Sequence, residues 1–308
     1  MKLALKPGID FCICTFNRVE FLKMNVDSLL SQWVSGSSVI TVVDNNSTDG
    51  TKEYIQMLVN EHKTIRYIAE YQQGLSFARN RGWKESEYEW IYYLDDDCVV
   101  PQDFPREAIS LIEKHHDLDA LGGPVDPLFV VPPPEWLPTG FGSFSIPSEE
   151  VITLEKGYLR GNNFLIRKSV LSSLGGFNTS LGMSGKTLKY AEELELQYRM
   201  RISGYQIGYA PSLRINHYVR TEKISLGWLL RSEYAKRRDK MVFDPVSLFQ
   251  ATLHLTRTMI SRLFWVPLHF ATALLNSKYT WRNAMLDAFL PLAHRTGEWI
   301  GAFQYKFN

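Results

Sequence analysis

Residues Trp90–Val100, with the sequence WIYYLDDDCVV, decide the fold. A run of apolar and aromatic residues leads directly into three consecutive carboxylates, Asp95, Asp96 and Asp97, and the chain becomes apolar again at Val99. Carboxylates this close together raise one another's pKa and oppose folding unless a cation neutralises them. Because carboxylate oxygens suit hard divalent ions, the stretch indicates a Mg²⁺ or Mn²⁺ site at the end of a buried strand. An ordinary acidic turn is the simpler alternative, since Asp is common in turns.

The first half of the chain alternates between strand-like and helix-like patterns. Continuous or alternating apolar runs predict strands over Ile9–Thr15, Val39–Val43, Ile65–Ala69 and Trp90–Leu94. Helical spacing of apolar residues predicts helices from an N-cap at Asn17 to Trp33, over Thr51–Val59 with Ser47 and Thr48 as caps, from Gly74 onward, and over Asp103–His115. This order predicts an α/β fold, a mostly parallel sheet with helices on both faces. Such sheets bind ligands at the carboxyl ends of their strands, where the aspartates lie.

The second half is less regular. Seven prolines predict that residues 124–147 lack regular structure, either as a binding loop or as a packed connector. The pattern then predicts a strand over Tyr158–Arg167, a glycine-containing loop over Leu181–Lys189, a helix over Tyr190–Ile202, and extended segments over Gln206–Ala210 and Leu213–His217. The last segment ends in a histidine, which could act as a ligand or pack structurally.

Composition limits the class of protein. The chain of 308 residues has 45% hydrophobic and 22% charged residues, which is typical of a folded globular protein of one or two domains. Cys12, Cys14 and Cys98 read as small core residues in a reducing compartment. The N-terminus leads directly into a strand and lacks a signal-peptide pattern.

Several spaced motifs between Ile9 and Val219 together resemble glycosyltransferase family 2, whose members have the nucleotide-sugar-binding GT-A fold. In chain order the motifs are CTFNR (Cys14–Arg18), VVDNNSTDGT (Val42–Thr51), GLSFARNRG (Gly74–Gly82), YLDDDCVVP (Tyr93–Pro101), GNNFLIRK (Gly161–Lys168), LGGFN (Leu174–Asn178) and AEELELQYRM (Ala191–Met200). Each motif alone is weak, but their order is specific. The resemblance implies a catalytic domain over 1–219, with a nucleotide-binding half (1–123) and an acceptor-binding half (124–219).

The resemblance also assigns site residues. Asp44 would accept a hydrogen bond from the base. The rest of the nucleotide-sugar site would comprise Thr15, Asn17, Arg18, Asn46, Arg79, Asp95 and Asp96. For Arg79, a solvent-exposed helix position is the plain alternative. Asp97 and Asp95 would ligate Mn²⁺ or Mg²⁺, and His217 could complete the coordination. Glu193 would be the catalytic base, with Glu192 as the alternative, although the family more often has an Asp in a Glu-Asp pair here.

The implied reaction is an inverting transfer of a sugar from a nucleotide-diphosphate donor to a hydroxyl of a glycan or lipid-linked acceptor, in cell-surface polysaccharide biosynthesis. Inversion follows because single displacement needs one base on the face opposite the leaving group. The alternative is a nucleotide-sugar-binding or nucleotidyltransferase-like protein without glycosyl transfer. However, CTFNR is not the Gly-rich basic loop of nucleotidyltransferases. A dehalogenase-type phosphatase would need Thr where Val99 stands.

The C-terminal segment 220–308 lies outside the resemblance. It carries 13 Lys or Arg against 6 Asp or Glu, in helical patterns rich in apolar and aromatic residues. Basic residues beside apolar helices indicate peripheral contact with a membrane. The family resemblance implies that this contact is at the inner, cytoplasmic face. The alternative is a helical domain that packs on the catalytic body or forms a homo-oligomer. Nucleic acid is not expected as a partner, because the basic residues accompany a long apolar segment.

Overall fold

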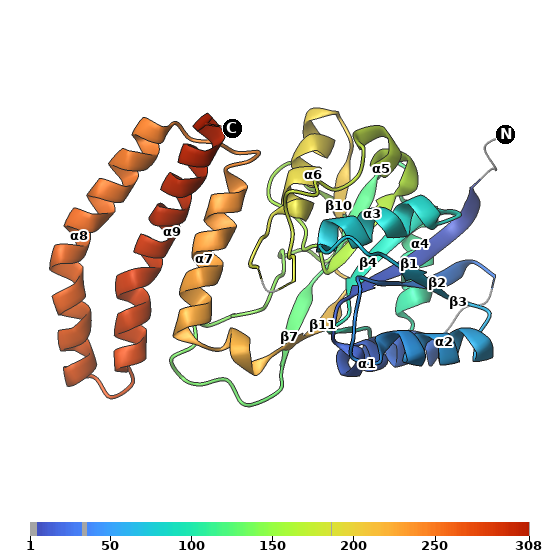
Figure 1. The fold of residues 1–308 in the computed structure, drawn as a ribbon, viewed down its shortest axis with the longest axis horizontal. Coiled ribbons are helices and arrows are strands. Elements are labelled where there is room, and N and C mark those ends of the chain that lie inside the picture. The colour runs from blue at the N-terminus through green and yellow to red at the C-terminus, as the bar shows by residue number, and fades with distance from the viewer. Residues whose placement is uncertain (1–4, 33–35, 186, 308) are drawn as a thin grey trace. The chain divides into compact units, whose positions relative to one another are not determined.

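The chain forms an α/β fold, built on a β-sheet with parallel and antiparallel strands, and a further group of helices (Figure 1). The computed structural model describes residues 5–32, 36–185 and 187–307. The chain divides into two compact units. The sheet unit comprises Met1–Leu128, Gly142–Gly185 and Glu192–Tyr218, and the helical unit comprises Phe129–Phe141, Lys186–Ala191 and Val219–Asn308. The expected α/β class and C-terminal helical segment are confirmed.

The main sheet has eight strands in the order β3-β2-β1-β4-β9-β6-β10-β8. Its members are β1 (Lys6–Thr15), β2 (Ser38–Asp44), β3 (Ile65–Ala69), β4 (Tyr88–Asp95), β6 (Ala120–Gly122), β8 (Ile152–Thr153), β9 (Asn163–Arg167) and β10 (Ile207–Tyr209). Strands β1 to β4 are parallel, whereas β9 runs antiparallel to both of its neighbours. The carboxyl ends of β1, β2 and β4 therefore meet at one edge, with Thr15 beside Asp44 and Cys14 beside Asp95.

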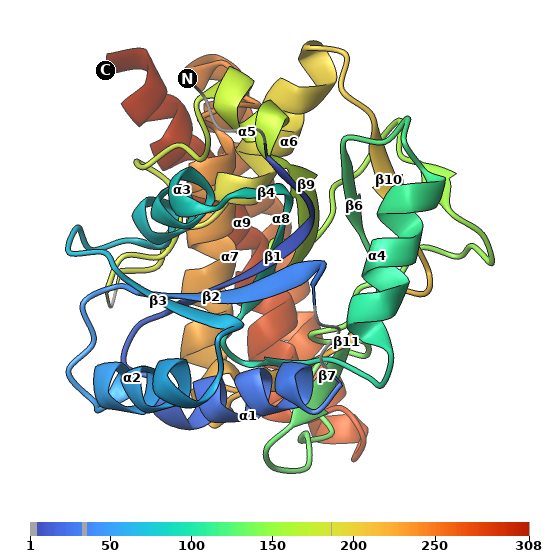
Figure 2. The same ribbon diagram turned by 90° about the vertical axis from the view of Figure 1, so that its right-hand side faces the viewer.

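Helices cover both faces of this sheet (Figure 2). One core cluster joins it to α1 (Val19–Leu30), α2 (Thr51–Glu61) and α4 (Phe104–Lys114), and the other to α3 (Leu75–Glu85), α5 (Lys168–Leu174) and α6 (Glu192–Ile202). Helix α3 packs very closely, since a Cβ at Gly82 would lie 2.3 Å from Cys12 Sγ. The long apolar runs of β1, β2 and β4 follow from this burial on two faces.

A small second sheet brings a distant strand to the aspartates. Its order is β5 (Cys98–Val99), β11 (Ile215–Val219) and β7 (Val125–Phe129). Strand β11 runs antiparallel to β5, and His217 pairs with Cys98. Because Cys98 directly follows the aspartate triplet, this register places His217 beside it.

Several local predictions are wrong. Arg18, not Asn17, caps α1, and Gly50, not Ser47 or Thr48, caps α2. Asn17 instead has φ 52° and bridges two loops, because its Oδ1 accepts from the backbone N of Thr48 at 2.7 Å.

The second half also departs from the predicted boundaries. The proline-rich stretch contains β7 and a β-bridge between Val125 and Phe144. The strand expected over Tyr158–Arg167 begins only at Asn163, and the structure adds a helix, α5, that the sequence pattern does not predict. Trp33, at the expected end of the first helix, lies outside the described residues.

The helical unit contains a short 3₁₀ turn (Thr221–Lys223) and three helices, α7 (Leu226–Lys240), α8 (Leu248–Leu275) and α9 (Trp281–Phe307). Helix α9 contacts both α7 and α8. The buried Trp136, from the proline-rich stretch, packs with Leu229 and Leu286. Among the described residues, α8 is the one helix whose length and composition would suffice to cross a membrane.

Candidate active site

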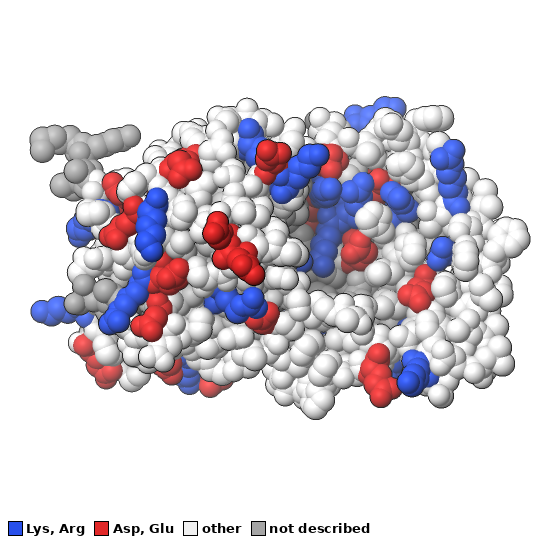
Figure 3. Space-filling view, turned by 180° about the vertical axis from the view of Figure 1, so that it is seen from behind, with Lys and Arg blue, Asp and Glu red and all other residues white. Residues whose placement is uncertain are grey.

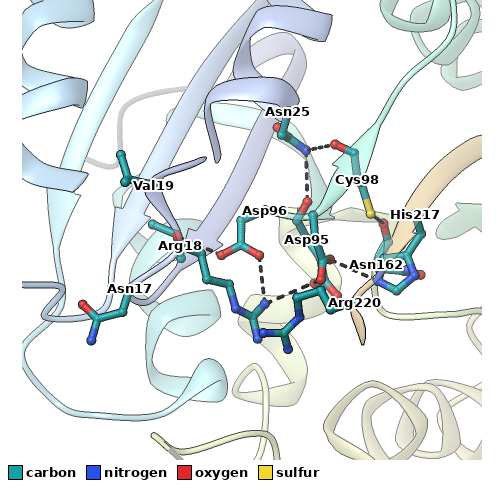
Figure 4. A network of polar contacts seen from close by, with 12 residues as sticks. Asn17, Arg18, Val19, Asn25, Asp95, Asp96, Cys98, Asn162, His217 and Arg220 are labelled. Atoms are coloured by element: carbon teal, nitrogen blue, oxygen red, sulfur yellow. Dashed lines mark hydrogen bonds and ion pairs between the residues drawn. The ribbon is translucent and has the colours of Figure 1, made fainter. Parts of the chain in front are cut away.

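The aspartate triplet forms a tight turn that α1 holds in place. Asp95 is the last residue of β4, and its side chain is 34% exposed, whereas Asp96 and Asp97 are buried. The side-chain amide of Asn25, on α1, donates to the carbonyl oxygens of Asp95 at 3.0 Å and Cys98 at 2.9 Å (Figure 4). These two hydrogen bonds fix the backbone of the turn from which the three carboxylates project.

Asp96 faces the end of β1 and the start of α1. It accepts hydrogen bonds from Thr15 Oγ1 at 2.8 Å and Arg18 Nη1 at 3.0 Å (Figure 4). Burial nevertheless raises the pKa of Asp96 to about 6, with Arg18 opposing the shift and Asp97 adding to it. The structure thus brings Thr15, Arg18 and Asp96 together, and the three fix the loop after β1 to the loop after β4.

Asp97 turns toward β11 and contacts the predicted histidine. His217 Nε2 lies 3.0 Å from Asp97 Oδ1, and one ligand atom each from Asp95, Asp97 and His217 lies within 4.8 Å of the others. Two carboxylate oxygens and one imidazole nitrogen at this spacing can hold a single divalent ion, and the donor set suits Mn²⁺ or Mg²⁺. The three residues therefore fit the implied metal. Arg18 Nη1, 3.7 Å from Asp97 Oδ2, supplies positive charge at the same place.

Arg79 is not a solvent-exposed helix residue. It is buried, and its guanidinium contacts Glu192 Oε1 at 2.9 Å, Asp95 Oδ1 at 3.2 Å and the carbonyl oxygen of Gly161 at 3.1 Å. The rings of Tyr93 and Phe177 lie within 6 Å of it, at cation–π distances of 5.7 and 5.4 Å. Arg79 thus links the aspartate triplet to the start of α6.

Glu192 and Glu193 begin α6 in different environments. Glu192 is buried against Arg79, whereas Glu193 is half-buried. Burial, followed by repulsion from Glu193, raises the pKa of Glu192 to about 8, although Arg79 opposes this shift. The residue before them, Ala191, has φ 72°, an unfavourable backbone conformation for alanine. Strain of this kind clusters at functional sites.

The end of β2 carries the residue expected to bind the base. Asp44 is buried, and its carboxylate accepts from Tyr67 Oη at 3.0 Å and from the backbone N of Ser47 at 2.9 Å. Asn46 follows on an exposed loop with φ 67°. Asp44 and Asn46 lie at the same sheet edge as Asp95, but the structure shows no direct contact from Asn46 or Asn17 to the aspartates among the described side-chain hydrogen bonds.

Sequence reasoning missed three residues that organise this edge. Asn25 holds the aspartate turn, and Tyr67 holds Asp44. Asn45 fixes the loop before α3, since its Oδ1 accepts from the backbone N of Gly74 at 2.7 Å and its amide donates to the carbonyl oxygen of Gln72 at 2.7 Å. For Asn25 the sequence does contain a signal. It stands among the apolar positions of α1, and a polar side chain buried there needs a hydrogen-bond partner.

Comparisons with known proteins identify the family to which the chain belongs. A sequence model described as Glycosyl transferase family 2 matches residues 10–175, more than half of the chain. A glucosyl-dolichyl phosphate glucuronosyltransferase of Haloferax volcanii is 24% identical over 250 residues, which cover 78% of each chain. A poly-beta-1,6-N-acetyl-D-glucosamine synthase of Staphylococcus epidermidis is 29% identical over 116 residues, which cover 38% of this chain and 28% of the synthase.

Among solved structures, a mannosyltransferase of Pyrobaculum calidifontis in complex with GDP-Man and Mn²⁺ has the same fold. It superposes with a TM-score of 0.62 and 17% identity, over 94% of this chain and 87% of that one. The matched family region includes the aspartate triplet, Arg79 and the ends of β1 and β2. The chain belongs to glycosyl transferase family 2.

Proposed function

We propose that the protein is an inverting, metal-dependent glycosyltransferase that moves a sugar from a nucleotide-diphosphate donor to a hydroxyl of a glycan or lipid-linked acceptor. One observation carries the proposal. The side chains of His217, Asp97 and Asp95 form a cluster suited to a metal, and Arg79 connects Asp95 directly to Glu192 at the start of α6. Donor-side and acceptor-side functions are thus adjacent in the sheet unit.

The donor half of the reaction belongs to the edge formed by β1, β2 and β4. Asp44 would accept a hydrogen bond from the base, as its place at the end of β2 suits. Asp95, Asp97 and His217 would hold a divalent ion, which supplies charge to offset that growing on the leaving diphosphate. Arg18, half-buried beside Asp96 and Asp97, would add a second positive charge there. These residues bind and orient the donor.

The acceptor half needs a base, and the environment of the two glutamates favours Glu193. Arg79 holds Glu192 in a buried ion pair at 2.9 Å, so the Glu192 carboxylate is already engaged and is poorly placed to take a proton from an acceptor hydroxyl. Glu193 is more exposed and adjoins Gly161, where a Cβ would lie 3.2 Å from the Cβ of Glu193. We assign to Glu193 the removal of the acceptor hydroxyl proton, and to Glu192 the positioning of Arg79.

Glycosyl transfer itself has support from both curated relatives, whose names describe a glycosyltransferase and a polysaccharide synthase. The glucuronosyltransferase name refers to a dolichyl phosphate, which is a lipid carrier. We therefore propose a lipid-linked glycan acceptor and action at the cytoplasmic face of a membrane, in polysaccharide or glycan assembly. The three cysteines are free, as a reducing compartment requires.

A panel of nucleotide sugars tests the proposal. We expect one of them to raise the Tm of the protein when Mn²⁺ is present, and to be hydrolysed slowly without acceptor. Asp97→Asn should lose the Mn²⁺-dependent part of the shift, while Glu193→Gln should keep the shift and lose turnover. Nuclear magnetic resonance of the product should show an inverted anomeric centre. Binding of a nucleotide sugar without turnover by the wild-type protein would instead support the binding-protein alternative, and indifference to the whole panel would refute both.

A further inference from the structure

Helix α8 presents a long apolar face to solvent. Within its 28 residues only Ala251 is buried, and Leu274 and Leu275 are 87% and 88% exposed. Large exposed apolar side chains extend over its whole length: Phe249, Leu253, Met259, Ile260, Leu263, Phe264, Trp265 and Leu268. The outer edge of the helical unit is accordingly a largely uncharged surface (Figure 3). A patch this extensive marks an interaction site, because soluble proteins rarely leave one uncovered.

The opposite side of α8 is already occupied by α9. Three polar contacts join the two helices: His254 Nδ1 to Glu298 Oε2 at 3.2 Å, Trp299 Nε1 to Thr252 Oγ1 at 3.1 Å, and Arg262 Nη1 to the carbonyl oxygen of Asp287 at 3.0 Å. Helix α9 in turn packs on α7. The apolar face of α8 therefore points away from its own unit, and its rotation about the helix axis is fixed.

Charge identifies the occupant of this face. No Asp or Glu occurs between Asp244 and Asp287, whereas Arg257, Arg262, Lys278 and Arg282 do. Cations beside an apolar helix face match a lipid surface with anionic headgroups. The exposed indole rings of Trp265 and Trp281 also suit the boundary between headgroups and acyl chains. A second copy of the chain fits less well, because two identical faces that carry basic residues and no acidic ones would repel each other.

The neighbours of α8 decide between crossing a bilayer and lying in its surface. At 1.5 Å per residue α8 is about 42 Å long, enough to span a hydrocarbon core of about 30 Å. However, α9 accompanies it and contains Glu298, fully buried between Arg237 Nη2 at 2.6 Å and Arg295 Nη1 at 2.8 Å. Helix α7 carries seven charged residues within Arg231–Lys240. Carrying these charges into hydrocarbon is costly, so α8 cannot span with its neighbours attached.

We propose that α8 lies in the plane of an anionic membrane and inserts its exposed apolar face into one leaflet, while α9 and α7 stay on the aqueous side. This deepens the proposed function and rests on it only for the lipid-linked acceptor. It specifies the partner as a lipid surface and the mode as monotopic.

Flotation with lipid vesicles tests the partner. The full chain should bind vesicles that contain phosphatidylglycerol about tenfold more tightly than vesicles of phosphatidylcholine alone. The double variant Leu263→Glu/Phe264→Glu should weaken binding to the phosphatidylglycerol vesicles at least about a hundredfold. Ile202→Glu, which adds a charge at a 68% exposed apolar position of the sheet unit, is the matched control and should bind like the wild type. Circular dichroism and Tm should show that all variants are folded.

Cysteine labelling tests the mode. Pro245→Cys and Ser277→Cys place thiols just beyond the two ends of α8. With protein bound to the outside of sealed vesicles, an impermeant maleimide should label both positions. Labelling of only one would show a spanning helix and overturn the in-plane arrangement.

Two other results would overturn the inference, and neither would bear on glycosyl transfer. One is equal vesicle binding by the wild type and the double variant, or no binding by either. The other is a concentration-dependent dimer in solution that the double variant abolishes, which would assign the face to a second copy. The Mn²⁺- and nucleotide-sugar-dependent Tm shift, measured without lipid, tests the proposed function separately.

Discussion

The guanidinium of Arg79 and the carboxylate of Glu192 form a buried ion pair, with 2.9 Å between Nη1 and Oε1, although the residues are 113 positions apart. The same guanidinium contacts Asp95 at 3.2 Å. One side chain therefore joins the proposed metal site, formed by Asp95, Asp97 and His217, to the first turn of the helix that carries the proposed base. A substitution at Asp95 should therefore alter the environment of Glu192, and a substitution at Glu192 should alter that of Asp95.

Removing Arg79 should be strongly destabilising. Arg79→Met leaves Glu192 buried and Asp95 half-buried without their counter-charge, which should cost about 3–5 kcal/mol of the free energy of unfolding in urea. Arg81→Met is the control, since Arg81 is exposed on the same helix and its pair with Glu85 should contribute less than about 1 kcal/mol. Adding Glu192→Gln to Arg79→Met should recover part of the loss. Equal effects of the two single variants would contradict the buried pair.

Substitutions of Glu192 and Glu193 should have different effects on the enzyme kinetics. Glu193→Gln should lower kcat by about 10²–10⁴-fold, the usual contribution of a general base, with little change in the nucleotide-sugar-dependent Tm shift. Glu192→Gln should change the stability and KM more than kcat. The pH profile distinguishes the roles independently. A wild-type rate that rises with pH through about 8, and loses that dependence in Glu192→Gln, would assign the base to Glu192 instead.

Arg18 should compete with a cation for the aspartates. Its guanidinium lies 3.0 Å from Asp96 Oδ1 and 3.7 Å from Asp97 Oδ2. Arg18→Gln therefore removes a positive charge next to the proposed metal ligands. Binding of Mn²⁺ alone, followed by electron paramagnetic resonance, should tighten about three- to tenfold. Lys23→Gln, which breaks an exposed pair on the same helix, should leave Mn²⁺ binding unchanged. Weaker Mn²⁺ binding by Arg18→Gln would show that the arginine supports the site.

Asp10 should make stability depend on pH. This carboxyl is buried in β1, and desolvation raises its pKa from 3.8 to about 6 even though Arg66 lies 4.0 Å away. Between these values the folded state binds more protons than the unfolded state, so stability falls as the pH rises through this range and then levels off above about 6.

Asp10→Asn removes this dependence. Relative to the wild type, the variant should therefore gain stability as the pH rises, by up to about 3 kcal/mol over the whole window. Urea unfolding at a series of pH values measures the difference. Asp27→Asn, at an exposed position, is the control for the loss of a carboxylate and should change the stability little. A difference for Asp10→Asn that does not vary over this pH range would mean that the Asp10 carboxyl is charged in the folded protein.

The sheet was predictable because its signals are local. β3 matches its predicted bounds, and β1, β2 and β4 extend theirs by a few residues. Strands buried on both faces are continuous apolar runs, and their order implies parallel neighbours. Helix caps were less predictable, since the loops after β1 and β2 bond to each other through Asn17 and Ser47 instead of to the helices that follow.

The sequence by itself determined the α/β class, the acidic end of the fourth strand and the family. These follow from composition, the periodicity of apolar residues and the order of motifs, all of which can be recognised along the chain without knowledge of its contacts in space. Only the tertiary structure decided that Arg79 is buried between Asp95 and Glu192, that β11 brings His217 to Asp97, and that α8 keeps an apolar face uncovered. These relations depend on strand register and on which side of each helix is covered. Such contacts join residues far apart in the chain, and no local pattern encodes them.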